Sequence, residues 1–237
     1  MYTSFDDKIQ PNSKSCFFQQ QLNPSSGEQV SNYYSNCSDQ DSILNAIEEI
    51  DACISANIRQ ENYAVAIALI DQLINHQPDS AINYNNRGLM HFKNNQLAEA
   101  IDDLNRALAI NPKLDSAYNN RANCHAAQGD LVAAISDYDE ALDINPGNLR
   151  AWINQGITFR DISSYDLALG NFDICLILGS SLKSTIYGER GRTYHLRGDW
   201  NCAVSDYNRS LNLLEGLADS DDYRAKVQSW LDELINY

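Results

Sequence analysis

Two consecutive stretches of the chain decide its fold. Ala81–Leu114 reads AINYNNRGLMHFKNNQLAEAIDDLNRALAINPKL, and Asp115–Asn148 reads DSAYNNRANCHAAQGDLVAAISDYDEALDINPGN. Each is 34 residues long, and four columns keep this step along the chain: Pro78, Pro112 and Pro146; Tyr84, Tyr118 and Trp152; Gly88, Ala122 and Gly156; and Ala66, Ala100, Ala134 and Ala168. A period of this length predicts repeated helix pairs that stack to bury a continuous core.

Each repeat divides into two helices at a short turn. In Ala81–Leu114 the first helix is predicted to end near Asn94, and the second to run from about Leu97 to Ile110, because Pro112 cannot continue it. Apolar residues at helical spacing line the second helices: Leu97, Ile101, Leu104 and Leu108 in one repeat, and Leu131, Ile135, Tyr138 and Leu142 in the next. A single helix pair cannot bury such a stripe, whereas stacked neighbours can.

These columns resemble the tetratricopeptide repeat (TPR), with its large aromatic, small residue four positions later, small alanine in the second helix and closing proline. The repeats are 47–80, 81–114, 115–148, 149–183 and 184–217. The first lacks the aromatic and the glycine, and the fourth has Cys175 and Ser180 where the motif has alanine and proline. The resemblance implies an all-α, right-handed helix-turn-helix solenoid of about five repeats over 41–237. The phrase Tyr-Asn-Asn-Arg resembles repeats of cyanobacterial and plastid proteins.

The two ends of the chain differ from the repeats. Residues 220–236 open with acidic side chains, which favour a helix start, and continue with an apolar stripe that includes Trp230. We expect a helix here that caps the last repeat; partner binding by Trp230 is the alternative. Residues 1–40 are polar and predict a disordered tail. Its pairs Phe17-Phe18 and Tyr33-Tyr34 are candidate anchors, with a solvated arm as the favoured interpretation.

Composition limits the class of partner. The formal net charge is −15, which argues against nucleic acid and against an anionic membrane surface. No targeting segment and no run of 18 apolar residues is found, so we expect a soluble cytoplasmic protein. No cysteines stand at metal-ligand spacing, and reduced packing thiols are expected. Four of them are predicted at small or core positions of helices: Cys53, Cys124, Cys175 and Cys202.

A search for chemistry finds no phosphate-binding loop and no metalloprotease or serine-hydrolase motif. We therefore expect no enzyme activity, no metal and no cofactor. His91 and His125 are one repeat apart, as paired ligands would be, but they stand in a column that the family fills with aromatics, so packing is favoured. Carboxylates that recur on second helices are predicted to lie on a solvated outer face: Asp102, Asp103, Asp137 and Asp139.

The resemblance places the binding groove on the first helices, which line the concave face of TPR arrays. The candidate partner-binding residues are Asn85, Leu89, Phe92, Asn119, Asn123, Arg150, Asn154, Arg160, Arg192 and His195. The early positions are neutral or apolar, and the later ones gather arginines in an acidic protein. Guanidinium groups bind carboxylates well, which suggests an acidic ligand. In the other interpretation, each arginine pairs with an acid of its own chain, such as Asp161 or Glu189.

The carboxylate clamp of chaperone-binding TPR proteins is not predicted. That clamp takes a Lys and an Asn from one first helix, an Asn from the next, and a Lys and an Arg from the third. The triplet of repeats from Asp115 supplies the two asparagines, Asn123 and Asn154, but none of the basic residues. At the last position it has Glu189, which would repel a carboxylate.

These patterns favour a non-catalytic adaptor or scaffold. It would bind a peptide or protein segment in the groove, through contact and through asparagine hydrogen bonds to an extended backbone. By analogy with cyanobacterial proteins, a role as an assembly factor for a larger complex is one setting. The alternative is a structural protein that self-associates through its terminal faces and whose groove holds its own N-terminal tail.

Overall fold

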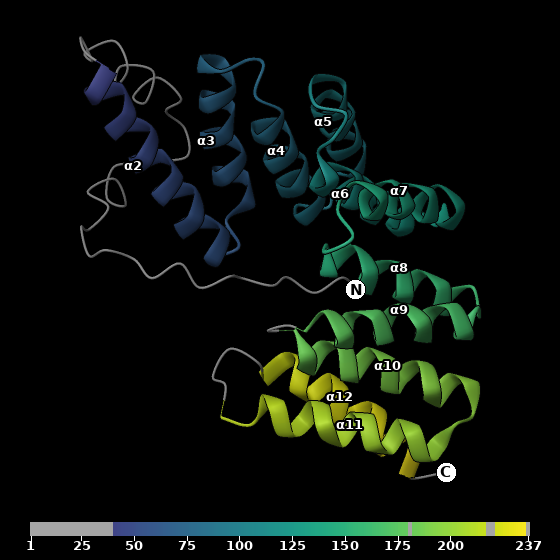
Figure 1. The fold of residues 1–237 in the computed structure, drawn as a ribbon. Helices are drawn as coiled ribbons and strands as arrows, with labels where there is room; N and C mark the ends of the chain where they lie inside the picture. Colours follow the sequence, from purple (N-terminus) through teal and green to yellow (C-terminus); the bar gives the residue numbers. More distant parts are fainter. Residues whose placement is uncertain (1–39, 180–181, 217–220, 236–237) are drawn as a thin grey trace. The chain divides into compact units, whose positions relative to one another are not determined.

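The computed structural model of the chain describes residues 40–179, 182–216 and 221–235, with side chains from residue 49 onward. Over these residues the chain is almost wholly helical and has no strand, which confirms the all-α class (Figure 1). The predicted tail lies outside the described residues, apart from Gln40. The helices are α2 (Gln40–Arg59), α3 (Tyr63–His76), α4 (Ala81–Lys93), α5 (Leu97–Ile110), α6 (Asp115–Gln128), α7 (Leu131–Ile144), α8 (Leu149–Asp161), α9 (Tyr165–Leu178), α10 (Lys183–Arg197), α11 (Trp200–Leu214) and α12 (Asp221–Ile235).

One backbone feature recurs at the turn between the two helices of every repeat. The residue at the same position takes a positive φ each time: Glu61 (57°), Asn95 (60°), Gly129 (84°), Ser163 (62°) and Gly198 (94°). A left-handed residue ends the first helix and redirects the chain, which glycine does at little cost. Since the degenerate stretch 47–80 shares this turn, it keeps the register of its neighbours.

Contacts group the chain into two compact parts, Met1–Ile110 and Asn111–Tyr237. The described helices of the first part are α2 to α5, and those of the second are α6 to α12. Within each part every helix packs on the next one in the chain. The repeats before and after this division, 81–114 and 115–148, are both 34 residues long. The sequence period therefore gives no sign that the chain divides after α5.

Two columns of the second helices form the core of each part. The alanine column is fully buried in all five repeats: Ala66, Ala100, Ala134, Ala168 and Ala203. Four positions later stand larger side chains, none more than 2% exposed: Ile70, Leu104, Tyr138, Phe172 and Tyr207. The small residues let the helices approach, and the larger ones fill the space between them at the density of a protein interior.

The four described cysteines are free thiols, but only some are core residues. Cys124 and Cys175 are buried, and burial raises the pKa of each thiol to about 12. Cys53 is half-buried. Cys202 is exposed, so its predicted core position was wrong. It precedes the buried Ala203, and one residue turns a helix by about 100°, which puts Cys202 on the outer side of α11.

A polar bridge joins successive repeats. On α4, α8 and α10 one side chain bonds both to the second helix of its own repeat and to that of the preceding repeat. Arg87 on α4 pairs with Asp103 on α5 (2.6 Å) and with Asp71 on α3 (2.5 Å). The same geometry recurs for Arg190 with Asp206 (2.7 Å) and Asp173 (2.6 Å).

The fourth repeat builds the same bridge without an arginine. Gln155 accepts from the Asn171 amide (2.9 Å) and donates to Asp139 on the preceding second helix (2.6 Å). In the third repeat, Arg121 pairs with Asp137 at 2.7 Å. In all four repeats, the bridge residue of the first helix and its partner on the second helix of the same repeat are 16 residues apart.

These bridges correct the prediction for the carboxylates of the second helices. Asp103 and Asp137 are buried, because each faces the guanidinium of its own first helix. Asp102 and Asp139 are exposed, as predicted, although Asp139 also accepts the bond from Gln155. A carboxylate buried to this extent requires a charged or hydrogen-bonding partner, and the arginine supplies it.

His91 and His125 lie beside the same bridges. The Nε2 atom of His91 is 3.7 Å from the Asp103 carboxylate, and that of His125 is 3.8 Å from Asp137. Each histidine follows its arginine by one helical turn, so both side chains reach one carboxylate. The two histidines are therefore polar neighbours of the bridge, in a column where the fourth and fifth repeats carry Phe159 and Tyr194.

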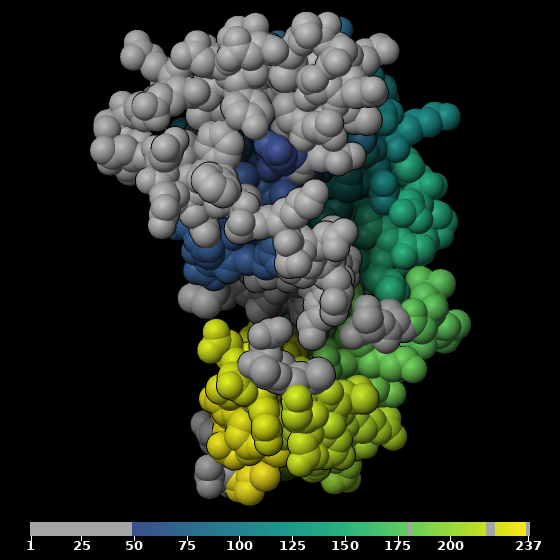
Figure 2. Space-filling model, turned by 90° about the vertical axis from the view of Figure 1, so that its left-hand side faces the viewer, coloured from purple at the N-terminus to yellow at the C-terminus, as the bar shows by residue number. Residues whose placement is uncertain are grey.

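The last helix packs on the second helix of the fifth repeat, where a cap was expected. The surface of α12 lies beside that of α11 (Figure 2). Val227 and Leu231 are buried in this contact, and the Trp230 ring lies 6.1 Å from the Tyr207 ring. The outer positions of α12 are polar and exposed: Asp221, Asp222, Arg224, Gln228 and Asp232.

We predict that Gly156→Leu destabilises the protein. A Cβ at Gly156 would lie 3.0 Å from the buried Phe172 ring, so a larger side chain overpacks the junction, at a cost of about 1–3 kcal/mol. The matched control is Gly170→Leu, because nothing lies within 4 Å of a Cβ there. Thermal unfolding followed by circular dichroism should show a lower Tm for the first variant alone. Equal melting curves would mean that the helices do not meet at Gly156.

We also predict that the arginine–aspartate bridge of the fifth repeat can be replaced by the glutamine–asparagine pair of the fourth repeat. Arg190→Gln or Asp206→Asn alone should cost about 3 kcal/mol, because each leaves a charge without its main partner. The double variant copies Gln155 and Asn171 and should recover most of that loss. Urea unfolding of the four proteins measures the coupling between the two sites. Strictly additive losses would contradict a shared bridge.

Candidate functional site

In the second part, the first helices of successive repeats touch one another. Contacts join α6 to α8, α8 to α10 and α10 to α12, so α12 takes the place that the first helix of a further repeat would occupy. We call the surface along these four helices the first-helix face. Its polar and charged residues are Asn119, Asn123, Asn154, Arg160, Glu189, Arg192, His195, Tyr223, Lys226 and Glu233, together with the ring of Trp230.

The α6 and α8 portion of this face is lined by amides. The Asn154 side chain donates to the Asn119 carbonyl oxygen (3.2 Å), which links the two helices directly. Asn119 in turn donates to Asn120 (3.3 Å). The oxygen of Asn123 accepts the Tyr138 hydroxyl at 2.7 Å, so this amide is tied to the core. Of the predicted asparagines, Asn119 and Asn154 are therefore the pair that the structure brings together.

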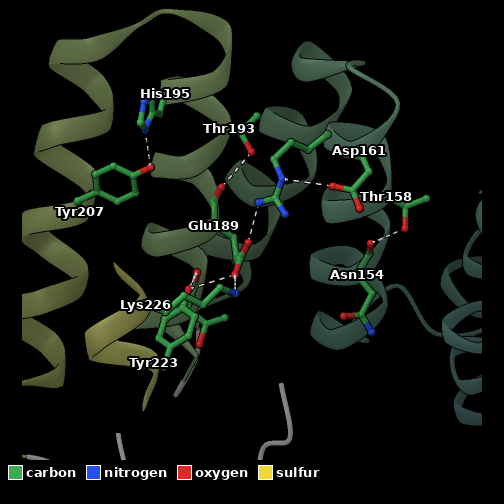
Figure 3. Close-up of polar contacts among 11 residues, drawn as sticks. Asn154, Thr158, Asp161, Glu189, Thr193, His195, Tyr207, Tyr223 and Lys226 are labelled. Carbon is green, nitrogen blue, oxygen red and sulfur yellow. Dashed lines mark hydrogen bonds and ion pairs between the residues drawn. The ribbon is translucent and has the colours of Figure 1, made fainter. Parts of the chain in front are cut away.

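The portion between α8, α10 and α12 is built around one buried carboxylate (Figure 3). Glu189 is 2% exposed and accepts from Arg160 (2.6 Å), Lys226 (3.1 Å) and the Tyr223 hydroxyl (3.4 Å). Arg160 also lies 3.6 Å from Asp161. Three helices thus meet at a single anion, and two of the contacts come from the C-terminal helix.

The charges hold Glu189 ionised despite its burial. Burial alone would raise the pKa of the Glu189 carboxyl, but Arg160 and Lys226 outweigh it, and the net effect is a lowered pKa. The resulting stabilisation is present above the pKa of an unfolded-state glutamate and is lost as pH falls through the folded pKa. Burial and the Glu189 carboxylate raise the pKa of Tyr223, so its hydroxyl remains a donor.

Arg192 has a different environment. It donates to Glu233 on α12 (2.7 Å), lies 5.6 Å from the centroid of the Trp230 ring and approaches His195 Nδ1 at 3.3 Å. The Tyr207 hydroxyl lies 3.3 Å from the same nitrogen. Burial and the Arg192 charge lower the pKa of His195, which keeps its imidazole neutral at pH 7. Glu233 is 47% exposed, in contrast to Glu189.

The remaining predicted site residues do not join this cluster. Arg150, at the start of α8, is exposed. In the first part, Asn85 on α4 is buried and donates to Asn86 (3.3 Å). Leu89 is half-buried and packs on the core cluster of that part, and Phe92 is also half-buried.

Sequence reasoning missed the contribution of α12. Tyr223, Lys226, Trp230 and Glu233 recur every three or four residues and form one stripe of the helix. This spacing was a usable signal, since treating 220–236 as a further first helix would have placed the stripe beside α10.

Comparison with known proteins defines the family. Models of the tetratricopeptide repeat match residues 54–122 and 116–148. A solved structure titled as a thermophilic TPR protein, TTC0263 of Thermus thermophilus, is similar with a TM-score of 0.67, at 16% identity, over 76% of this chain and 98% of its own. Residues 54–148 are therefore tetratricopeptide repeats, and the chain is a TPR protein. Its family and fold are those of a protein-interaction scaffold.

Other similar structures share the fold at low identity. A crystal structure of MamA has a TM-score of 0.58 at 16% identity, over 70% of this TPR chain and 96% of its own. The MamA RS-1 ArsTM double mutant has a TM-score of 0.58 at 10% identity, over 73% and 96%. No curated protein sequence matches the chain.

The following two statements hold for residues 40–179, 182–216 and 221–235. None of their helices has both the length and the apolar character that a membrane span requires. They also contain no group of three or more His, Cys, Asp or Glu side chains arranged to hold a metal ion.

We predict that the two arginines differ in their effect on stability. Arg160→Gln leaves buried Glu189 with Lys226 as its remaining cation and should cost about 3 kcal/mol. Arg192→Gln breaks a pair with exposed Glu233 and should change stability by less than about 1 kcal/mol. Urea unfolding at neutral pH compares the two variants. A loss at Arg192 as large as that at Arg160 would contradict this assignment.

Proposed function

We propose that this TPR protein is a non-catalytic adaptor that binds an extended segment of a partner protein along its first-helix face. The proposal rests on the amide pair Asn119 and Asn154, which joins α6 and α8 on that face. A primary amide has two N–H donors and a carbonyl acceptor, and the bond to Asn119 uses one N–H of Asn154. Asn119 is 6% exposed and donates to Asn120, so the half-buried Asn154 presents the remaining N–H and carbonyl groups, which suit the N–H and C=O groups of an extended backbone.

The ion pairs of this face support a smaller role for arginine in ligand binding than the sequence suggested. Removing one partner of a buried ion pair costs about 3–5 kcal/mol, so a ligand cannot easily draw Arg160 away from Glu189. The internal pairing that was left open for the arginines is present at Arg160 and at Arg192. Joint binding of an acidic ligand by Arg150, Arg160 and Arg192 is therefore not part of the proposal. The amides carry the main contact with the ligand backbone.

The titratable groups of this face also support an adaptor. Glu189 and Tyr223 have shifted pKa values, which often mark catalytic sites. Here both groups are buried and bonded to each other, to Arg160 and to Lys226, and these contacts hold three helices together. Their shifts are accounted for by packing, without a reaction.

We predict that the double variant Asn119→Ala and Asn154→Ala loses binding while remaining folded. The full chain, immobilised, would capture partners from cells of its source organism, with mass spectrometry as the readout. Partners retained by the original chain and lost by the double variant are the expected result. The matched control replaces two exposed asparagines of α11, Asn201 and Asn208, by alanine and should capture the same partners. Equal capture by all three proteins would exclude the amide pair as the binding surface.

The alternative, self-association with the tail in the groove, involves residues outside the described part of the chain. Light scattering coupled to size exclusion, on the same preparation, separates it from the adaptor. The adaptor proposal expects a monomer at all concentrations. A concentration-dependent dimer, with no partner lost by the asparagine variant, would favour the structural alternative.

A further inference from the structure

The C-terminal end of the first-helix face holds two cations against one aromatic ring. The Lys226 ammonium lies 4.5 Å from the centroid of the Trp230 ring, and the Arg192 guanidinium carbon lies 5.6 Å from it. Both distances are within the range of cation–π attraction. The same ring packs on Tyr207, at 6.1 Å between centroids. The Trp230 ring thus contacts two positive charges that come from different helices.

The counterions of these two cations are not equivalent. Lys226 pairs with Glu189, whose side chain is 3% exposed and which is also held by Arg160 and Tyr223. Arg192 pairs with Glu233, whose side chain is 47% exposed. Within the described residues, Glu233 is the carboxylate in contact with Arg192. Arg192 therefore has a partner that solvent and solutes reach, next to a network that they do not.

Exposed ion pairs contribute little to stability, because water and salt compete with both partners. Glu233 is accordingly an exchangeable occupant of the Arg192 guanidinium. A second carboxylate can take its place and form the same charge-assisted hydrogen bond to Arg192. Neither Arg160 nor Glu189 moves in such an exchange.

We propose that Arg192, held against the Trp230 ring, forms a subsite for one carboxylate of a bound peptide, which Glu233 occupies in the free protein. This inference deepens the proposed function, since it assumes a peptide on the first-helix face. It assigns Glu233 the role of an intramolecular competitor that lowers the affinity for acidic ligands. The carboxylate comes from an acidic side chain or from a chain terminus, because the guanidinium presents the same donors to both.

The test uses the full chain and three short peptides: Ac-GSGEGSG-NH2, its glutamine counterpart Ac-GSGQGSG-NH2, and the glutamine peptide with a free C-terminal carboxylate. Two-dimensional NMR follows the indole N–H of Trp230, assigned by its loss in Trp230→Phe. We expect this signal to shift with at least one carboxylate peptide and not with the neutral one. The peptide that shifts it identifies the source of the carboxylate. No shift with any of them overturns the proposal.

Two variants with the same change in net charge sharpen the result. Glu233→Gln removes the competitor and should raise the affinity for the carboxylate peptide about fivefold, the factor that corresponds to one exposed ion pair. Asp232→Asn removes the neighbouring exposed charge, which bonds to Gln228, and should change the affinity less than about twofold. Equal gains in both variants would show a general charge effect and overturn the assignment of Glu233.

Arg192→Gln should abolish the shift of the Trp230 signal, and Arg192→Lys should retain a weaker one, because a point charge remains without the planar fork. The dispersion of the remaining signals reports whether each variant is folded. These readouts are independent of Asn119 and Asn154. A fivefold gain in Glu233→Gln, with unchanged partner capture by the asparagine variant, would retain the subsite and reject the proposed backbone contact.

Discussion

The alignment of three of the five repeats depends on one side chain of the first helix that bonds to two second helices at once. Arg87, Gln155 and Arg190 each project from a first helix, bond within their own repeat and bond again to the repeat before. A guanidinium or amide in this position has several donors or acceptors in fixed directions, so it is satisfied only when both neighbours are in register. Apolar contacts alone do not fix how one repeat is aligned on the next. The directed hydrogen bonds of these side chains select one alignment.

The same constraint explains the C-terminal end of the first-helix face. There Glu189 takes the position that asparagine holds in the three preceding repeats, and a buried carboxylate needs cations. Arg160 supplies one from α8 and Lys226 another from α12, so the cap is fixed by charge as well as by Val227 and Leu231. The most buried arginine of the face is therefore paired internally, and our proposals assign ligand contacts to the amide pair and to Arg192 instead.

Much of the fold could be predicted from the sequence, because period, turn residues and proline positions are local signals. In the repeat 81–114 the second helix was predicted within its observed bounds, Leu97–Ile110. The polar pairs were not predicted. Asp103 and Asp137 were assigned to solvent because helical spacing relates residues three or four apart, whereas their partners lie 16 residues away on another helix. The pairing of Arg160 with Glu189 was left open, because the pattern of α8 does not reveal which side chain of α10 faces it.

The first repeat shows what the bridges contribute. At the positions of the donor and of its partner within the repeat it has Cys53 and Leu69, which belong to one apolar cluster, and its helices still pair. Replacing a buried ion pair by apolar residues is often neutral or stabilising, so the bridges are not required for the energy of stacking. Their effect is on register. A slip of one residue would leave a buried aspartate without its arginine, at a cost of several kcal/mol, whereas Cys53 and Leu69 would lose only contact area. We infer that the apolar columns supply the stability of each part, and that the polar column decides which of several apolar alignments is adopted.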